Sequence, residues 1–114
     1  MGFLESGCGW LLYWLWRLDE EYKNLYFEVK NHVTIKPSEY FYRQCFVAIE
    51  PSEPYLARII EYIGSDNLIF GSDYPHMDHQ PEVVKKVLEL EEQLSQETVQ
   101  KIVWDNPARF YYCT

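Results

Sequence analysis

Acidic side chains follow three short apolar segments of this sequence. Glu5 and Glu50 are the last residues of two such segments, and Asp73 follows the third, which spans residues 67–71. In folds built on parallel strands, functional groups collect where the strands end. A carboxylate at that position can ligate a divalent metal or take a proton from bound water. These three acids are therefore the first candidates for site residues.

Asp73 has the surroundings that best suit such chemistry. The small residues Gly71 and Ser72 precede it and leave room for a metal or a substrate. His76 and His79 follow within a few residues, and His76 is a candidate to support Asp73. A His-x-x-His spacing in a loop is weak evidence for a metal site, because exposed loop histidines are common. Asp73 is thus the main candidate, and an ordinary strand end followed by a turn is the alternative.

The other two acids lie in different local sequences. Glu5 precedes Ser6-Gly7-Cys8-Gly9, a loop whose glycines would let a ligand approach the backbone. Glu50 directly precedes Pro51, and Glu53 lies three residues further on. Acids placed in this way commonly cap loops or helix N-termini, where the helix dipole favours negative charge. We therefore expect a capping role for Glu50 and keep Glu5 as a candidate catalytic residue.

The chain alternates short apolar segments with helical patterns, which predicts β-α units and parallel pairing. The segments lack a clean polar alternation, as in a sheet covered on both sides. Pro37 suits a first helical position, Gly64 reads as a helix stop, and Ser95 reads as a plain N-cap. The expected elements are strands at residues 2–5, 45–50 and 67–71, a short turn or single helical turn at 36–40, and helices at about 10–26, 53–63, 81–90, 95–104 and 105–112.

Apolar spacing predicts which side of each helix faces the core. Three helices carry such a pattern, at residues 10–26, 53–63 and 81–90. Their expected inner residues are, in chain order, Leu11, Trp14, Leu15, Leu18 and Tyr22, then Leu56, Ile59, Ile60 and Ile63, then Val83, Val84, Val87 and Leu88.

Composition bounds the class of protein. The 114 residues are 47% apolar and 18% aromatic, enough for one core, so we treat residues 1–114 as one domain unit. A net charge of −8 argues against nucleic-acid binding and against an anionic membrane surface. The apolar run at residues 9–16 is too short to span a bilayer. No signal pattern is visible, and the odd set Cys8, Cys45 and Cys113 predicts free thiols in a cytoplasmic protein.

The motif Gly71-Ser72-Asp73-Tyr74-Pro75-His76 after an apolar strand resembles the last-strand motif of the amidohydrolase-related metal-dependent hydrolases. This group includes the aminocarboxymuconate-semialdehyde-decarboxylase-like enzymes. Further segments resemble the same proteins in the same order along nearly the whole chain. They are residues 3–10 with 13–14 and 17–20, residues 36–41 and 43–47, residues 63–68, and Ile102 with residues 105–111.

This resemblance implies that the chain is the C-terminal three or so β-α units of a (β/α)₈ barrel. It implies a small-molecule substrate, a divalent metal such as zinc, and a role for Asp73 as a metal ligand or acid/base. The family's other ligands, a first-strand His-x-His and a middle-strand His, have no counterpart here, and His32 is expected at the surface. Many decarboxylase-type members carry a His-Gly-Gly loop where this chain has residues 5–9. Hydrolysis and decarboxylation therefore both stay open.

Three hypotheses arise for the chain by itself. In the first, it is part of an amidohydrolase-related enzyme and neither binds metal nor turns over substrate alone. In the second, it is an interaction module that associates with itself or with a complementary barrel fragment. Its contact surface would then be the aromatic face that includes Trp10, Trp14, Leu15 and Leu18. In the third, Asp73 acts with the other two candidates, Glu5 and His76, in metal-assisted hydrolysis by a small self-sufficient domain.

Overall fold

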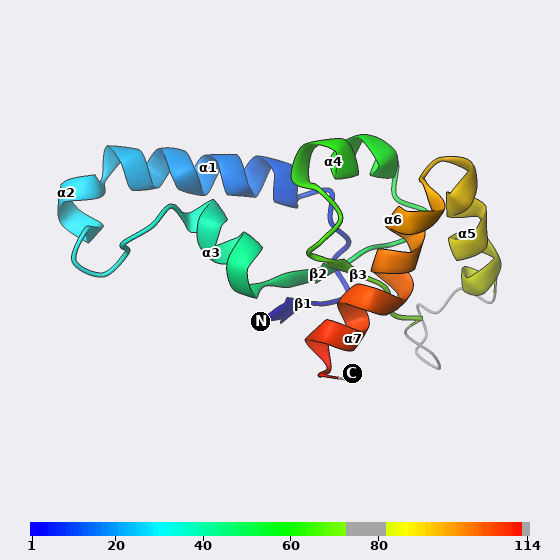
Figure 1. Cartoon of the computed structure of the whole chain (residues 1–114). Helices are drawn as coiled ribbons and strands as arrows, with labels where there is room; N and C mark the ends of the chain where they lie inside the picture. Colours follow the sequence, from blue (N-terminus) through cyan, green and yellow to red (C-terminus); the bar gives the residue numbers. More distant parts are fainter. Residues whose placement is uncertain (73–81, 113–114) are drawn as a thin grey trace.

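Three short parallel strands form the centre of the computed structural model, which describes residues 1–72 and 82–112 (Figure 1). The strands β1 (Gly2–Phe3), β2 (Phe46–Ala48) and β3 (Leu68–Ile69) lie side by side in the order β1-β2-β3. Gly2 pairs with Phe46 and Val47 pairs with Leu68, both in parallel register. The predicted parallel pairing is confirmed, but each strand is shorter than its apolar segment.

Helices fill the connections between the strands, as the alternating pattern predicts. A 3-10 turn at Leu90–Glu92 follows the helix α5, and a π-helical turn at Lys101–Asp105 separates α6 from α7. The helices are α1 (Leu11–Asn24), α2 (Tyr26–Val29), α3 (Pro37–Gln44), α4 (Leu56–Ile63), α5 (Val83–Glu89), α6 (Gln96–Gln100) and α7 (Asn106–Phe110). Pro37 opens α3, and the Gly64 N–H donates to the Ile60 carbonyl at 2.8 Å to close α4, so both predicted boundaries are confirmed.

The hydrophobic core lies where α1, α4 and the C-terminal helices meet the sheet. Its most completely buried side chains are Cys8, Leu11, Val47, Leu68 and Ile102. They come from the loop after β1, from α1, from β2, from β3 and from the π-helical turn. Each of these elements therefore contributes to one shared core, which fixes the sheet relative to its helices.

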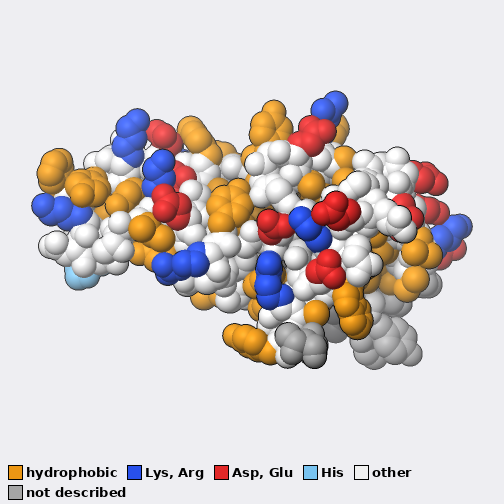
Figure 2. All heavy atoms as spheres, viewed as in Figure 1, with side chains coloured by type: hydrophobic (Ala, Val, Ile, Leu, Met, Phe, Trp, Pro, Cys, Tyr) orange, Lys and Arg blue, Asp and Glu red, His pale blue; other side chains and the backbone are white. Residues whose placement is uncertain are grey.

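The helix α1, with α2, forms an arm that extends away from the sheet (Figure 1), and the chain is elongated, measuring 49 × 30 × 30 Å. The prediction for its inner face is only partly right. Leu11 and Leu15 are buried, but 49% of Trp14 is exposed. Leu15 therefore belongs to the core and not to an exposed aromatic face. Figure 2 shows hydrophobic side chains at the surface of this arm. The exposed large hydrophobic residues of α1, of α2 and of the residue between them are Leu12, Tyr13, Trp14, Trp16, Leu25, Tyr26 and Phe27.

The prediction for α5 also needs correction. Val83 and Val87 are buried, whereas 65% of Val84 and 62% of Leu88 are exposed. The helix ends at Glu89, and the following 3-10 turn buries Leu90 instead. Val83, Val87 and Leu90 recur at the four- and three-residue spacing of one helix face, so only that face is buried and the adjacent face with Val84 and Leu88 is exposed.

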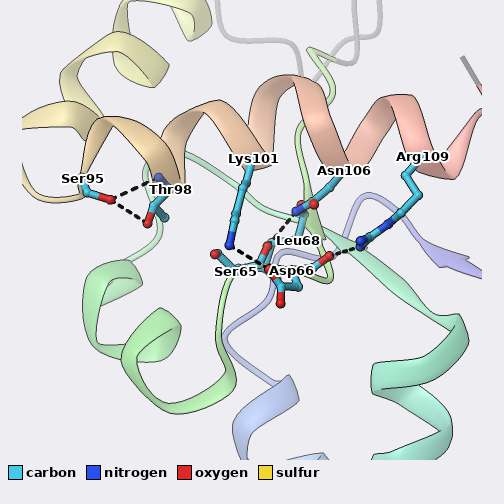
Figure 3. A network of polar contacts seen from close by, with 8 residues as sticks. All are labelled: Ser65, Asp66, Leu68, Ser95, Thr98, Lys101, Asn106 and Arg109. Carbon is cyan, nitrogen blue, oxygen red and sulfur yellow. Dashed lines mark hydrogen bonds and ion pairs between the residues drawn. The ribbon is translucent and has the colours of Figure 1, made fainter. Parts of the chain in front are cut away.

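The C-terminal helices α6 and α7 form one nearly continuous helical segment (Figure 1). Ser95 caps its start, because the Ser95 hydroxyl accepts a hydrogen bond from the Thr98 N–H at 3.1 Å (Figure 3), which confirms the predicted plain N-cap. The π-helical turn immediately precedes α7, which has Pro107 in its first turn. Proline cannot donate to the preceding turn and crowds a carbonyl there, and the wider π-helical turn accommodates this within the helix.

The side chain of Asn106 ties this helical segment to the start of β3 (Figure 3). Its Nδ2 donates to the carbonyls of Ser65 and Leu68, both at 2.7 Å, and the side chain is buried. Lys101 and Arg109 contact Asp66 in the same turn, Lys101 through an ion pair at 3.0 Å and Arg109 through a hydrogen bond to the carbonyl. The strand that leads toward Asp73 is thus held by the C-terminal helix.

Candidate functional site

A cavity of about 280 Å³ lies at the carboxyl edge of the sheet. Residues that follow all three strands line it, because parallel strands end at the same edge. The beginning of α5 and the end of the chain complete its wall. The lining residues are Leu4, Glu5, Ala48, Ile49, Glu50, Ile69, Phe70, Gly71, Ser72, Val83 and Tyr111. The predicted meeting of the strand ends is therefore present.

Glu5 lies at the rim of this cavity in an unusual backbone conformation. Its φ is 65°, in the left-handed region that costs energy for residues other than glycine. Its side chain is exposed, and within the part of the chain that the structure describes it makes no hydrogen bond or ion pair. The strained residue thus presents a carboxylate that the rest of the described fold does not use.

The carboxylate of Glu53 organises the two loops that carry Glu5 and Glu50. Glu53 Oε1 accepts from the Cys8 N–H at 3.0 Å and from the Glu50 N–H at 2.8 Å. Glu53 Oε2 accepts from the Cys8 N–H at 3.0 Å and from the Gly9 N–H at 2.8 Å. We expected Glu50 to be the capping acid at this strand end. The structure places Glu50 in the cavity wall, and at this strand end the carboxylate of Glu53 accepts hydrogen bonds from the backbone of both loops.

The loop at residues 5–9 fits tightly around this carboxylate. Gly7 has a φ of 65°, and a Cβ atom there would lie 2.9 Å from the Glu53 carboxyl carbon. The Trp10 indole N–H donates to the Gly7 carbonyl at 2.8 Å and fixes the loop from its other end. Glycine is therefore required at position 7 by both backbone conformation and space.

Cys8 is fully buried inside this loop. Burial, with a further contribution from the nearby negative charge of Glu53, raises the pKa of the Cys8 thiol to about 12. The thiolate is the reactive form of cysteine, so Cys8 is a core residue and not a nucleophile near neutral pH. Cys8 and Cys45 are both free thiols, as predicted for these two, and Cys113 lies outside the described residues.

Asp73 and His76, the other two predicted site residues, lie outside the described residues, as does His79. The described chain stops at Ser72 in the cavity wall, one residue before Asp73. His32 is exposed on the connection between α2 and α3, as expected for a surface residue. The structure therefore places Glu5 and Glu50 at one cavity, and the role of Asp73 stays a prediction.

The donor set for a metal is incomplete in the part of the fold that is described. Across residues 1–72 and 82–112, no three His, Cys, Asp or Glu side chains gather closely enough to hold a metal ion. We therefore derive no chemical step through a metal from these residues. Within the same residues, no helix has the length and apolar character needed to cross a bilayer.

A small parallel sheet connected by helices, with a cavity at its carboxyl edge, defines an α/β fold. The sequence profile of the family described as amidohydrolase matches residues 6–112. The chain therefore belongs to the amidohydrolase family. No curated protein sequence matches it.

Several solved structures share the fold, and two of them illustrate the likeness. One is an amidohydrolase from Mycobacterium avium subsp. paratuberculosis K-10, with a TM-score of 0.77 and 23% identity over 96% of this chain. The other is 5-carboxyvanillate decarboxylase LigW from Sphingomonas paucimobilis, with a TM-score of 0.66 and 24% identity over 90% of this chain. The match covers 26% of the first protein and 31% of the second. The chain thus spans about a quarter to a third of the structures it resembles.

Glu53 and Tyr111 are the site residues that sequence reasoning missed. Glu53 lies three residues after Glu50, and that local spacing gives no sign that its main partners are Cys8 and Gly9. Tyr111 reaches the cavity from the end of α7, far from β1 in sequence. A possible signal for Glu53 was the glycine-rich loop, since closely spaced backbone N–H groups need an acceptor.

Proposed function

We propose that this chain forms the C-terminal β-α units of a (β/α)₈ barrel and supplies part of an amidohydrolase-family active site. The observation that carries the proposal is the cavity at the carboxyl edge of the sheet, lined by the residues after all three strands. The family match over residues 6–112 supports it. The reaction would be hydrolysis or decarboxylation of a small molecule, the two classes named by the matched structures and family.

The edges of the sheet support the barrel assignment. β1 and β3 are the outer strands, and within the described residues no strand pairs with the outer edge of either one. Open edges of a parallel sheet expose unpaired backbone groups, and closure into a barrel satisfies them. The units that complete the barrel would come from further residues of a longer protein or from a second chain.

The same proposal accounts for the exposed apolar side chains of α1. Tyr13, Trp14 and Trp16 are each about half exposed, which is unusual for three large aromatic residues within four positions. We propose that the completing barrel units cover part of this face. Association of the chain with itself is the alternative, and the mass of the pure chain in solution separates the two.

In the proposed site, Asp73 would act as a metal ligand or as the acid/base that handles the attacking water. Glu5 would act on the substrate from the rim of the cavity, and His76 would support Asp73. A divalent metal, when bound, would polarise the substrate or activate water. It would need ligands from the completing units in addition to Asp73, because one carboxylate is too few for a catalytic metal site.

The test uses a chimera in which this chain replaces the matching quarter of the mycobacterial amidohydrolase. We expect the chimera to retain one divalent metal per chain, measured by plasma mass spectrometry, and Asp73→Asn to lose it. Glu5→Gln should keep the metal and lower turnover. Metal content that is unchanged by Asp73→Asn in a folded chimera would refute the role of Asp73.

Calorimetry on the isolated chain provides a second test that does not depend on the chimera. Titration with zinc chloride should show no stoichiometric binding to the chain alone. Tight binding of one zinc ion to the monomer would instead favour a self-sufficient domain that uses Asp73, Glu5 and His76. Light scattering on the same sample gives the mass, and a stable dimer would favour self-association.

A further inference from the structure

We propose that Glu53 is a positioning residue of the candidate site, which holds the Glu5 loop in its strained conformation at the cavity rim. This inference rests on the proposed function, because a positioning residue needs a functional site to position. The contacts of Glu53 themselves do not depend on any reaction. Glu53 itself does not line the cavity, and it acts through backbone groups of residues that lie beside it.

The contacts of Glu53 join two loops that are far apart in sequence. Three backbone N–H groups, those of Cys8, Gly9 and Glu50, converge on one carboxylate at 2.8–3.0 Å. Cys8 and Gly9 follow β1, whereas Glu50 follows β2. A single side chain thus fixes the distance between two neighbouring strand ends. Hydrogen bonds to a charged acceptor are the strong class in proteins, so this link is stiff.

The link constrains the backbone of Glu5. The chain leaves β1 at Phe3 and must reach the Cys8 N–H within five residues, and Glu5 and Gly7 both take a positive φ on the way. A left-handed conformation at a glutamate persists only where the surroundings impose it. The anchor at Cys8 and Gly9 supplies that constraint at one end of the loop, and β1 supplies it at the other.

The alternative is that Glu53 only stabilises the fold, as a carboxylate near the start of α1 does through the helix dipole. The two roles predict different behaviour. A general stabiliser changes the opening of all amides together when it is removed. A positioning residue changes the two loops first and leaves α4 unaffected, because local opening in proteins occurs in separate units.

Hydrogen exchange on the full chain, measured by NMR, tests this. In the wild type the amides of Cys8, Gly9 and Glu50 should be protected, since each donates to Glu53. In Glu53→Gln, which keeps the length but removes one acceptor oxygen, their protection should fall by at least about tenfold, as expected for a lost charge-assisted hydrogen bond. The Gly64 amide, at the end of α4, should change less than about twofold if global opening is unaffected.

The matched control is Glu61→Gln, which removes an exposed carboxylate that pairs with Arg58 at 3.1 Å on α4. It should leave the exchange of the loop amides unchanged, because surface pairs contribute little. The ¹³Cα and ¹³Cβ shifts of Glu5 report its backbone angle. They should indicate a left-handed residue in the wild type and move toward extended values in Glu53→Gln.

Two outcomes would overturn the proposal. One is fast exchange at Cys8, Gly9 and Glu50 in the wild type, which needs no variant and therefore does not depend on whether Glu53→Gln folds. The other is an equal loss of protection at the loops and at Gly64 in Glu53→Gln, with Glu5 shifts unchanged. Neither measurement involves metal or turnover, so failure of the proposed function in the chimera would be seen separately.

Discussion

Replacement of Asn106 by alanine should destabilise the fold by about 2.5 kcal/mol. The Asn106 side chain donates two hydrogen bonds of 2.7 Å to the carbonyls of Ser65 and Leu68, and only 3% of the residue is exposed. Each such bond contributes roughly 1 kcal/mol net, and a buried carbonyl that loses its donor costs about as much again. The better helix propensity of alanine offsets roughly 0.5 kcal/mol of the loss.

The assay is urea unfolding of the full chain followed by circular dichroism. The dependence of the unfolding free energy on urea concentration is compared between variants, because an unchanged slope means that only stability has changed. For a domain of this size the loss corresponds to a fall in Tm of about 10–20 °C. Asn106→Asp should be worse than Asn106→Ala, because it points a carboxylate oxygen at two carbonyl oxygens. This ordering separates hydrogen bonding from side-chain volume.

The matched control is Gln100→Ala in the preceding helix α6. Gln100 is exposed and makes one long contact of 3.4 Å to Asp105, so its removal should change stability by less than about 0.5 kcal/mol. If the free energies of unfolding of Asn106→Ala and Gln100→Ala differ by less than about 0.5 kcal/mol, the buried carbonyls have other donors and the reasoning is wrong.

Two further predictions concern the loop after β1. Gly7→Ala should cost more than about 1 kcal/mol in urea unfolding, because it adds backbone strain and displaces Glu53. Gly71→Ala, where φ is not positive and no atom of the described residues lies within 4 Å of the added Cβ, should cost less than about 0.5 kcal/mol. The raised pKa of Cys8 means that the folded chain keeps a proton that the unfolded chain loses above its ordinary pKa of about 9. Stability should therefore fall as pH rises from about 9 toward 12, and Cys8→Ala should flatten that part of the pH profile relative to Cys45→Ala.

Local signals in the sequence predict much of the fold correctly. The helix stop at Gly64 and the N-cap at Ser95 depend on backbone conformation and on partners three or four residues away, so they can be read from short segments. The alternation of apolar segments and helices likewise predicts parallel pairing, which the register confirms. The same local reasoning fails in part for α5, because its apolar residues cover a wider face than the one that packs against the core, and Val84 and Leu88 stay exposed.

The candidate site is predictable only in outline. The sequence indicates that Glu5 and Glu50 each follow an apolar strand, and in the structure both line the cavity at the carboxyl edge of the sheet. It does not indicate that Glu53 holds both loops, because the backbone groups at Cys8 and Gly9 lie more than forty residues away. Contacts of that separation depend on the assembled sheet and leave no periodic signal in a single sequence.

The Glu53 link has a consequence for how this chain can evolve. One carboxylate serves two loops, and the space it occupies is the space that a side chain at position 7 would need. The two positions therefore cannot change independently. A relative with a larger residue at the position of Gly7 should carry a shorter or uncharged residue at the position of Glu53, and should reach a different shape at this edge of the cavity. Covariation between the two loops, and not variation within either one, is the expected record of changes in specificity.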